Sequence, residues 1–174
     1  MDNSFEQCVR KADYTQDVKK YRMYKVFMII SAICALIGLV FLLLGQYFFG
    51  GAMLVLWVAV AFYFYKMKDA AIIEYDYEFI DGAITISRIY NQSKRKCVVS
   101  ISLEKVSEIA PTDINNLSKL YASEAKVINC ALNDDARLYL LRGSYKGQNI
   151  IVIWEPKLPL LKLIRSERVN LVIL

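Results

Sequence analysis

The most constraining feature of this sequence is a block of 40 consecutive residues, Val26–Tyr65, that contains no Asp, Glu, Lys, Arg or His. A helix needs about 20 apolar residues to cross the hydrocarbon core of a bilayer, so the block is long enough for two crossings. Its middle, Gly45–Gly51, has glycines at both ends and holds the single amide side chain of the block. We therefore predict a transmembrane helical hairpin over residues 26–66, with spans near Val26–Gly45 and Gly51–Tyr65.

Basic residues flank this block on both sides, whereas the connecting turn has none. They are Lys19, Lys20, Arg22 and Lys25 before the first span, and Lys66 and Lys68 after the second. Cytoplasmic segments carry an excess of Lys and Arg, so we predict a multi-pass protein of the cell membrane with both termini cytoplasmic. A signal peptide has an apolar region of only about 7–15 residues. A soluble helix pair needs a polar face, which this block does not offer.

Small residues follow one face of each predicted helix. They are Ser31, Ala35, Gly38 and Gly45 in the first helix, and Ala52 and Ala59 in the second. Close backbone approach drives helix association in lipid, so these residues are predicted to form an internal seam, although the short loop alone would also force the pairing. The spans hold no ionisable residue, which argues against transport of ions or protons.

Residues 1–25 are predicted to be a cytoplasmic N-terminal segment. Within it, Phe5–Tyr24 mixes apolar and charged residues. Two interpretations stay open for this stretch: an amphipathic helix lying at the membrane surface, or a helical extension of the first span.

Residues 70–174 show short strands separated by turn signals. Ile72–Ile80 alternates polar with apolar residues, Asp81-Gly82 is a strong hairpin signal, and Ala83–Tyr90 is the returning strand. Asn91–Lys96 is predicted to be a polar turn. Further strands are predicted over residues 97–103, 126–132, 137–144 and 149–154.

Two helices are predicted in the same part of the chain. Thr112-Asp113 has the character of an N-cap for a short helix, and Pro156 and Pro159 permit a helix start near the C-terminus. Val169–Leu174 is apolar enough to be a last strand or to dock on the domain. The fold class is therefore an α+β membrane protein: a two-helix transmembrane hairpin, then a mainly antiparallel β barrel or curled sheet with a C-terminal helix.

The stretch from Tyr77 to Ile109 resembles the bacterial pleckstrin-homology-like (PH-like) membrane proteins. The resemblance is carried by the strand–Asp-Gly–strand segment Phe79–Ile86, the basic stretch Lys94–Lys96, the segment Ile101–Ile109 and the sequence Ile153–Pro156 before a helix. The whole chain is similar to uncharacterised small membrane proteins of Gram-positive anaerobes. The resemblance implies a PH-like domain over residues 70–174. It implies little about activity, because one fold hosts many functions.

The sharpest candidate site is a cluster of cations, Arg88, Lys94, Arg95 and Lys96. Basic residues near a membrane surface attract anionic headgroups, each contributing about 1 kcal/mol. The eukaryotic PH domains use a comparable basic hairpin turn for phosphoinositides. The alternative is a solvated hairpin tip that only improves solubility.

Other combinations of residues predict little chemistry. The alternating carboxylates Glu74, Asp76 and Glu78 lack a convergent partner, and Asp134-Asp135 reads as a turn. The chain has no His, and its four cysteines include no CxxC pair. We therefore expect no enzyme, no cofactor and no metal site.

These observations lead to three functional hypotheses. The first is a non-enzymatic, membrane-anchored PH-like module that mediates protein interaction or self-association at the inner face of the membrane. The second is sensing of anionic lipid through Lys94–Lys96. The third, a small-molecule binder or enzyme, would need a deep polar pocket. The lipid bilayer is an expected partner, and nucleic acid is not, because the positive charge does not gather into a single stripe.

Overall fold

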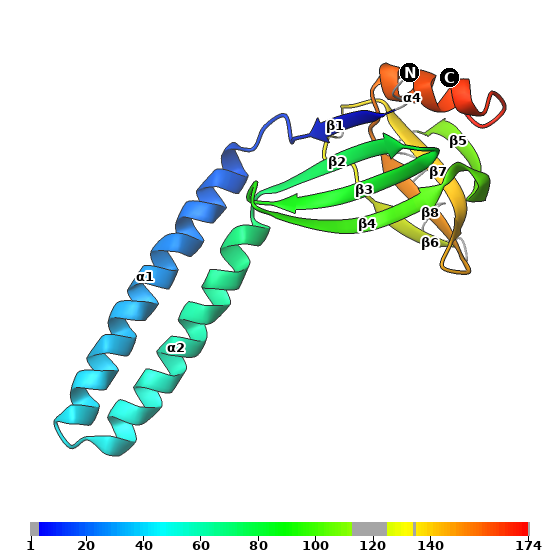
Figure 1. Cartoon of the computed structure of the whole chain (residues 1–174). Coiled ribbons are helices and arrows are strands. Elements are labelled where there is room, and N and C mark those ends of the chain that lie inside the picture. Colours follow the sequence, from blue (N-terminus) through cyan, green and yellow to red (C-terminus); the bar gives the residue numbers. More distant parts are fainter. Residues whose placement is uncertain (1–3, 113–124, 134, 174) are drawn as a thin grey trace. The chain divides into compact units, whose positions relative to one another are not determined.

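The computed structural model describes residues 4–112, 125–133 and 135–173, so most of the predicted short helix after Thr112, and the first residue of the Asp134-Asp135 turn, lie outside the described residues. The chain divides into two compact units. One comprises residues 13–73, and the other combines residues 1–12 with residues 74–174. The first is a helical hairpin and the second is a β-rich domain (Figure 1).

The hairpin consists of helices α1 (Thr15–Leu43) and α2 (Tyr47–Ala70). Gly45 adopts a φ of +85°, a conformation that suits glycine, and it lies in the short turn between the helices. The turn is shorter than the predicted Gly45–Gly51 stretch, because α2 begins at Tyr47 and includes Gly50 and Gly51.

The seam between the helices is partly as predicted. Ser31, Ala35 and Gly38 are the buried residues of α1. In α2 the buried residue is Gly50, where an added Cβ would lie 2.4 Å from the backbone nitrogen of Leu42. The predicted contributions of Ala52 and Ala59 are wrong, since both are exposed. Gly50 lies at the seam because a side chain there would push the two backbones apart.

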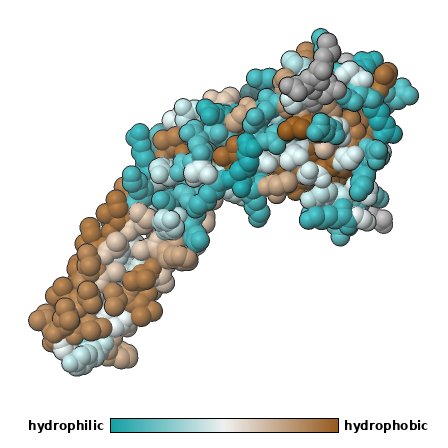
Figure 2. Space-filling view, viewed as in Figure 1, coloured by the Kyte–Doolittle hydropathy of each residue, from teal (hydrophilic) through white to brown (hydrophobic). Residues whose placement is uncertain are grey.

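Both helices are long and apolar enough to cross a membrane. Only 17% of the most apolar window of α1 and 6% of that of α2 is buried. Figure 2 shows apolar side chains over the outer surface of this unit. A helix from a soluble core would hide most of this surface, so the exposure is what a lipid-facing hairpin requires.

The first sheet of the domain has the strand order β1-β2-β3-β4. The strands are β1 (Phe5–Val9), β2 (Ile73–Ile80), β3 (Ala83–Tyr90) and β4 (Lys94–Ser102). Asp81 and Gly82 both have positive φ in the β2–β3 turn, as the Asp-Gly signal predicts. Strand β4 begins earlier than predicted, so Lys94–Lys96 lies in the strand and the turn is confined to residues 91–93.

Strand β1 is the main departure from the predicted organisation. An amphipathic helix was one interpretation of Phe5–Tyr24, but residues 5–9 alternate in burial and pair with β2. The helical extension of the first span is found, beginning at Thr15. Strand β1 comes before α1 in the chain and β2 comes after α2. The hairpin is therefore an insertion between two neighbouring strands of one sheet.

The second sheet has the order β5-β7-β8-β6. Its strands are β5 (Val106–Thr112), β6 (Lys126–Asn129), β7 (Leu138–Tyr145) and β8 (Gln148–Trp154). Strand β5 was not predicted, because it contains Pro111; the proline is tolerated because β5 is an edge strand. Strand β6 pairs parallel to β8, whereas β5–β7 and β7–β8 are antiparallel, in agreement with the prediction of mainly antiparallel strands.

The described strands form two four-stranded sheets and no closed barrel, and the core lies between them. The ring of Tyr77 from the first sheet packs edge-to-face on Trp154 from the second, with 5.4 Å between ring centroids. Helix α4 (Leu158–Glu167) adds Leu160, Leu161 and Ile164, which are fully buried. This is the predicted C-terminal helix.

The apolar C-terminal stretch docks on the domain rather than forming a further strand. Ile109 donates its backbone N–H to the carbonyl of Leu171, and its own carbonyl accepts from Ile173. This single parallel bridge covers the outer edge of β5.

Candidate functional site

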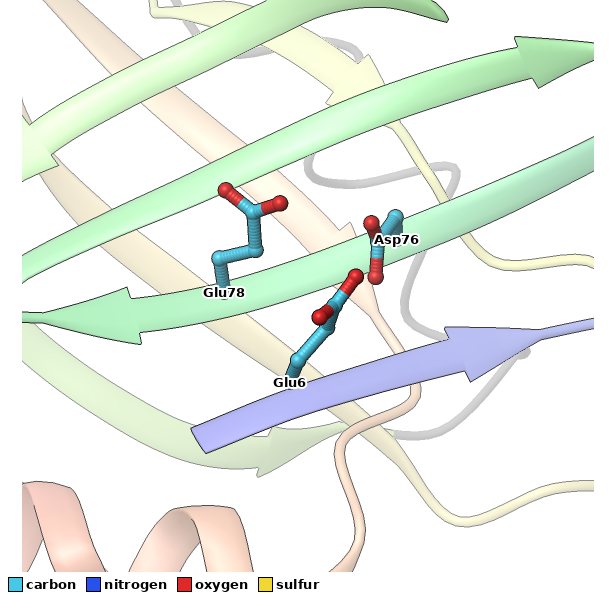
Figure 3. A group of neighbouring side chains, drawn as sticks. All are labelled: Glu6, Asp76 and Glu78. Carbon is cyan, nitrogen blue, oxygen red and sulfur yellow. The ribbon is translucent and has the colours of Figure 1, made fainter. Parts of the chain in front are cut away.

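Carboxylates gather on one face of the first sheet (Figure 3). The β1–β2 register places Glu6 opposite Glu78 and Cys8 opposite Asp76. Successive side chains of a strand alternate between faces, so Asp76 and Glu78 lie on the side opposite the core residue Tyr77. Asp76 is nevertheless only 1% exposed.

Arg95 of β4 crosses β3 to reach all three carboxylates. Its Nη1 lies 2.5 Å from Glu78 Oε1. Its Nη2 lies 3.2 Å from Glu6 Oε1 and also pairs with Asp76 Oδ2. We call these four residues the Arg95 cluster. Because it joins three strands, it acts as a cross-strand clamp on a sheet whose outermost strand, β1, is separated from the others in the chain by the hairpin.

Asp76 is the perturbed member of the Arg95 cluster. Its pKa is raised to about 6, mainly because burial disfavours the charged carboxylate. A hydrogen bond with Glu6 raises the pKa as well, and the positive charge of Arg95 lowers it. Asp76 Oδ1 is buried and has no hydrogen-bond partner among the described residues. With this pKa, Asp76 changes its protonation at mildly acidic pH.

Oxygen ligands of the type that Mg²⁺ and Ca²⁺ prefer are present here. One oxygen from each of Glu6, Asp76 and Glu78 lies within 4.8 Å of the others. In the structure, however, all three carboxylates are paired with the guanidinium of Arg95. A metal ion would have to displace this arginine, so we interpret the arrangement as an internal ion-pair network.

A second charged group surrounds Glu74, which is also buried. Arg10 Nε lies 3.1 Å from Glu74 Oε1, and Gln92 Nε2 donates to the same oxygen at 3.3 Å. The thiol of Cys8 donates to Glu74 Oε2 at 3.7 Å. Burial and the negative charge of Glu74 raise the pKa of Cys8, so the thiol stays protonated at neutral pH and is a poor nucleophile.

The four predicted cations do not converge on one point. The β3–β4 register pairs Arg88 with Lys96 and Ile89 with Arg95, which places Arg95 and Lys96 on opposite faces of the sheet. The guanidinium of Arg88 donates two hydrogen bonds to the hydroxyl of Tyr75 and lies over its ring. Arg95 is occupied by the carboxylates. Lys94 and Lys96 are exposed at the start of β4.

Sequence reasoning missed the contribution of β1 to this face. Glu6 belongs to the Arg95 cluster. Gln7, which is 5% exposed, donates to the carbonyl of Glu155 at 3.2 Å and accepts from the backbone N–H of Lys157 at 2.8 Å. The sequence carries little signal for this strand, because the polar residues Glu6 and Gln7 are adjacent and do not alternate with apolar residues.

Comparison with known proteins agrees with this architecture. A family model described as a bacterial PH-like domain (DUF6106) matches residues 5–172. The match begins at β1 and includes the inserted hairpin, both sheets and α4, and it confirms the predicted resemblance. No curated protein and no solved structure matches the chain.

Proposed function

Since the chain belongs to the bacterial PH-like domain family, we propose that it is a non-enzymatic, membrane-anchored module that binds a protein partner, or a second copy of itself, at the inner face of the cell membrane. The observation that carries this proposal is the insertion of the apolar hairpin between the adjacent strands β1 and β2. A domain tied at one edge of a sheet by two covalent connections is held near the bilayer without any lipid-binding site of its own.

The surface that we assign to the partner is the edge of β4. This strand has β3 as its sheet neighbour, and its residues 94–97 are exposed. An edge strand can pair with an extended segment of another chain. The charged side chains of Lys94 and Lys96 limit such pairing to partners that complement them, because lysines on an edge discourage unselective strand addition.

Photo-crosslinking of the full-length protein in its native membrane tests this assignment. A photoreactive residue replaces Lys96 on the β4 edge, and a control replaces Lys162, which is exposed on α4. We expect a protein adduct from position 96, at the mass of the chain itself or of a partner, and none from position 162. The adduct should weaken when Lys94→Glu reverses a neighbouring charge. Equal adducts from both positions, or lipid adducts alone from position 96, would overturn the assignment.

A second candidate function, anionic-lipid sensing, is favoured by the exposure of Lys94 and Lys96. Arg95 contributes little to it, because its guanidinium is paired with carboxylates. The test compares full-length protein in nanodiscs of phosphatidylcholine alone and with phosphatidylglycerol. A fluorophore on the exposed Cys97, in a Cys8→Ser background, reports proximity to a quencher in the lipid. Lipid sensing requires more quenching with phosphatidylglycerol, less at high salt, and no such difference in the Lys94→Gln/Lys96→Gln variant.

A further inference from the structure

A groove with a volume of about 370 Å³ lies in the β-rich domain, and its lining does not include residues 94–96. Three segments that are distant in the sequence form its walls: residues 7–10 at the end of β1, residues 133, 136 and 137 before β7, and residues 155–157 between β8 and α4. Its size is within the range of small-molecule sites, roughly 300–1,000 Å³.

Two polar side chains, the buried Gln7 and the half-buried Asn133, hold these walls together. Gln7 bridges β1 to the start of α4 through its two bonds to Glu155 and Lys157. Asn133 donates to the carbonyl of Arg10 at 3.0 Å, and its Oδ1 accepts from the backbone N–H of Ala12 at 2.6 Å. Side-chain hydrogen bonds therefore fix the walls of the groove relative to one another.

The charge that lines this groove is mainly positive. Arg10, Arg137 and Lys157 contribute one cation from each wall. The carboxylate of the lining, Glu155, is 7% exposed, and its two oxygens accept hydrogen bonds from Leu132 and Asn133. Both carboxylate oxygens of Glu155 are thus already hydrogen-bonded within the domain.

The three cationic side chains differ in the interactions that they already make with the rest of the domain. Arg10 pairs through Nε with Glu74 but is 61% exposed. Arg137 lies over the ring of Tyr139, 5.7 Å from its centroid. Within the described part of the chain, the ammonium of Lys157 makes no hydrogen bond or ion pair. The lining of one groove therefore contains two guanidiniums and an ammonium. Such a set of cations suits a phosphate-type oxyanion, because the guanidinium fork binds two oxygens at once.

We propose that this groove binds a phosphate-type oxyanion through Arg10, Arg137 and Lys157. The oxyanion belongs either to a phosphomonoester lipid headgroup or to a soluble phosphate ester; the chemistry at the groove is the same for both. This site is separate from the proposed protein-binding edge and from Lys94–Lys96, so it stands or falls independently of the proposed function.

Thermal unfolding of the full chain in nanodiscs tests the proposal, since a ligand that binds only the folded state raises the unfolding temperature. One arm adds inorganic phosphate or glycerol phosphate to phosphatidylcholine nanodiscs, against chloride at equal ionic strength. The other arm replaces part of the phosphatidylcholine by phosphatidic acid without soluble phosphate. A response in the first arm alone identifies a soluble ligand, and a response in the second identifies the headgroup.

Two double variants with the same loss of charge separate groove binding from general electrostatics. Arg137→Gln/Lys157→Gln removes groove cations, whereas Lys105→Gln/Lys162→Gln removes exposed lysines outside the lining. We expect the first variant to bind about 30-fold more weakly and the second to bind as the wild type does. The proposal is overturned if neither arm raises the unfolding temperature of the wild type, or if both variants lose the response equally.

Discussion

Val9 lies directly opposite Tyr75 in the antiparallel β1–β2 ladder, although both long apolar helices separate the two residues in the chain. The hairpin therefore enters and leaves the β-rich domain at neighbouring positions of one sheet. Strand β1 is only five residues long, so side-chain contacts must help to keep it in place.

Gln7→Ala should lower the free energy of unfolding of the domain by about 1–3 kcal/mol, because the carbonyl of Glu155 and the N–H of Lys157 lose their buried partner. Urea unfolding followed by the fluorescence of Trp154, in a Trp57→Phe background, measures the loss. Gln148→Ala, which removes the same type of side chain from an exposed position at the start of β8, is the control and should change the free energy little. Equal effects of the two substitutions would show that Gln7 has no special role.

Gly50→Ala should destabilise the helical hairpin by about 1–3 kcal/mol, because the new methyl group meets the backbone of Leu42. Gly51→Ala is a matched control, since its Cβ meets only a side-chain atom of Leu42, at 4.0 Å. Unfolding by sodium dodecyl sulfate, followed by circular dichroism in mild detergent, gives both values. If Gly51→Ala proves the more damaging substitution, the seam described for α2 is wrong.

Asp76 should make stability depend on pH in the direction opposite to that of an ordinary ion-paired carboxylate. Its pKa rises from 3.8 to about 6 on folding, so the folded protein binds more protons than the unfolded chain between these values. Its contribution to the free energy of unfolding is therefore greatest below about pH 4 and falls, by an amount on the order of 2 kcal/mol, as the pH rises to about 6.

The measurement for Asp76 is the difference in unfolding free energy between wild type and Asp76→Asn across this pH range. Taking the difference removes the common contribution of the other carboxylates. We expect the free energy of unfolding of the wild type, minus that of Asp76→Asn, to fall as the pH rises. An increase of this quantity with pH would contradict the prediction.

Arg95→Gln should raise the pKa of Asp76 above about 6, because the charge of Arg95 lowers that pKa in the wild type. Arg142→Gln is the control: the Arg142 side chain has the same exposure, 48%, but pairs with Glu108 in the second sheet. The carboxyl carbon of Asp76, titrated by nuclear magnetic resonance, reports the pKa directly. An unchanged titration in Arg95→Gln would mean that the ion pair does not persist in solution.

The proposed topology predicts which cysteines react with a membrane-impermeant maleimide. Cys97 is exposed in the β-rich domain, so it should be labelled only after the cells are permeabilised. Phe48, 93% exposed at the start of α2 next to the turn, should be labelled in intact cells as Phe48→Cys in a Cys8→Ser/Cys97→Ser background. Labelling of Cys97 in intact cells would reverse the orientation.

Local patterns were sufficient to predict much of this fold. The uncharged block predicted two helices, and the alternation on either side of Asp81-Gly82 predicted β2 and β3 with β3 bounded as found. These features follow from neighbours in the chain. The turn between two sequential strands fixes their register, which is why this hairpin could be predicted from the sequence.

Pairing between strands that are distant in the sequence could not be predicted in the same way. Strand β1 is short, its polar residues Glu6 and Gln7 are adjacent, and its partner follows only after the helices. The parallel pairing of β6 with β8 likewise depends on which strand reaches the edge of the sheet. The environment of Arg95 depends on the long-range β1–β2 pairing, since its carboxylate partners come from these two strands. A cation in a polar stretch therefore appeared solvent-facing in the sequence.

The position of the hairpin also constrains how the protein is made. Phe5–Val9 leaves the ribosome before the apolar helices, but its partner Ile73–Ile80 leaves after them. During synthesis, the first strand must therefore stay unpaired until this partner has emerged. Completion of the first sheet thus requires that both helices have already been synthesised.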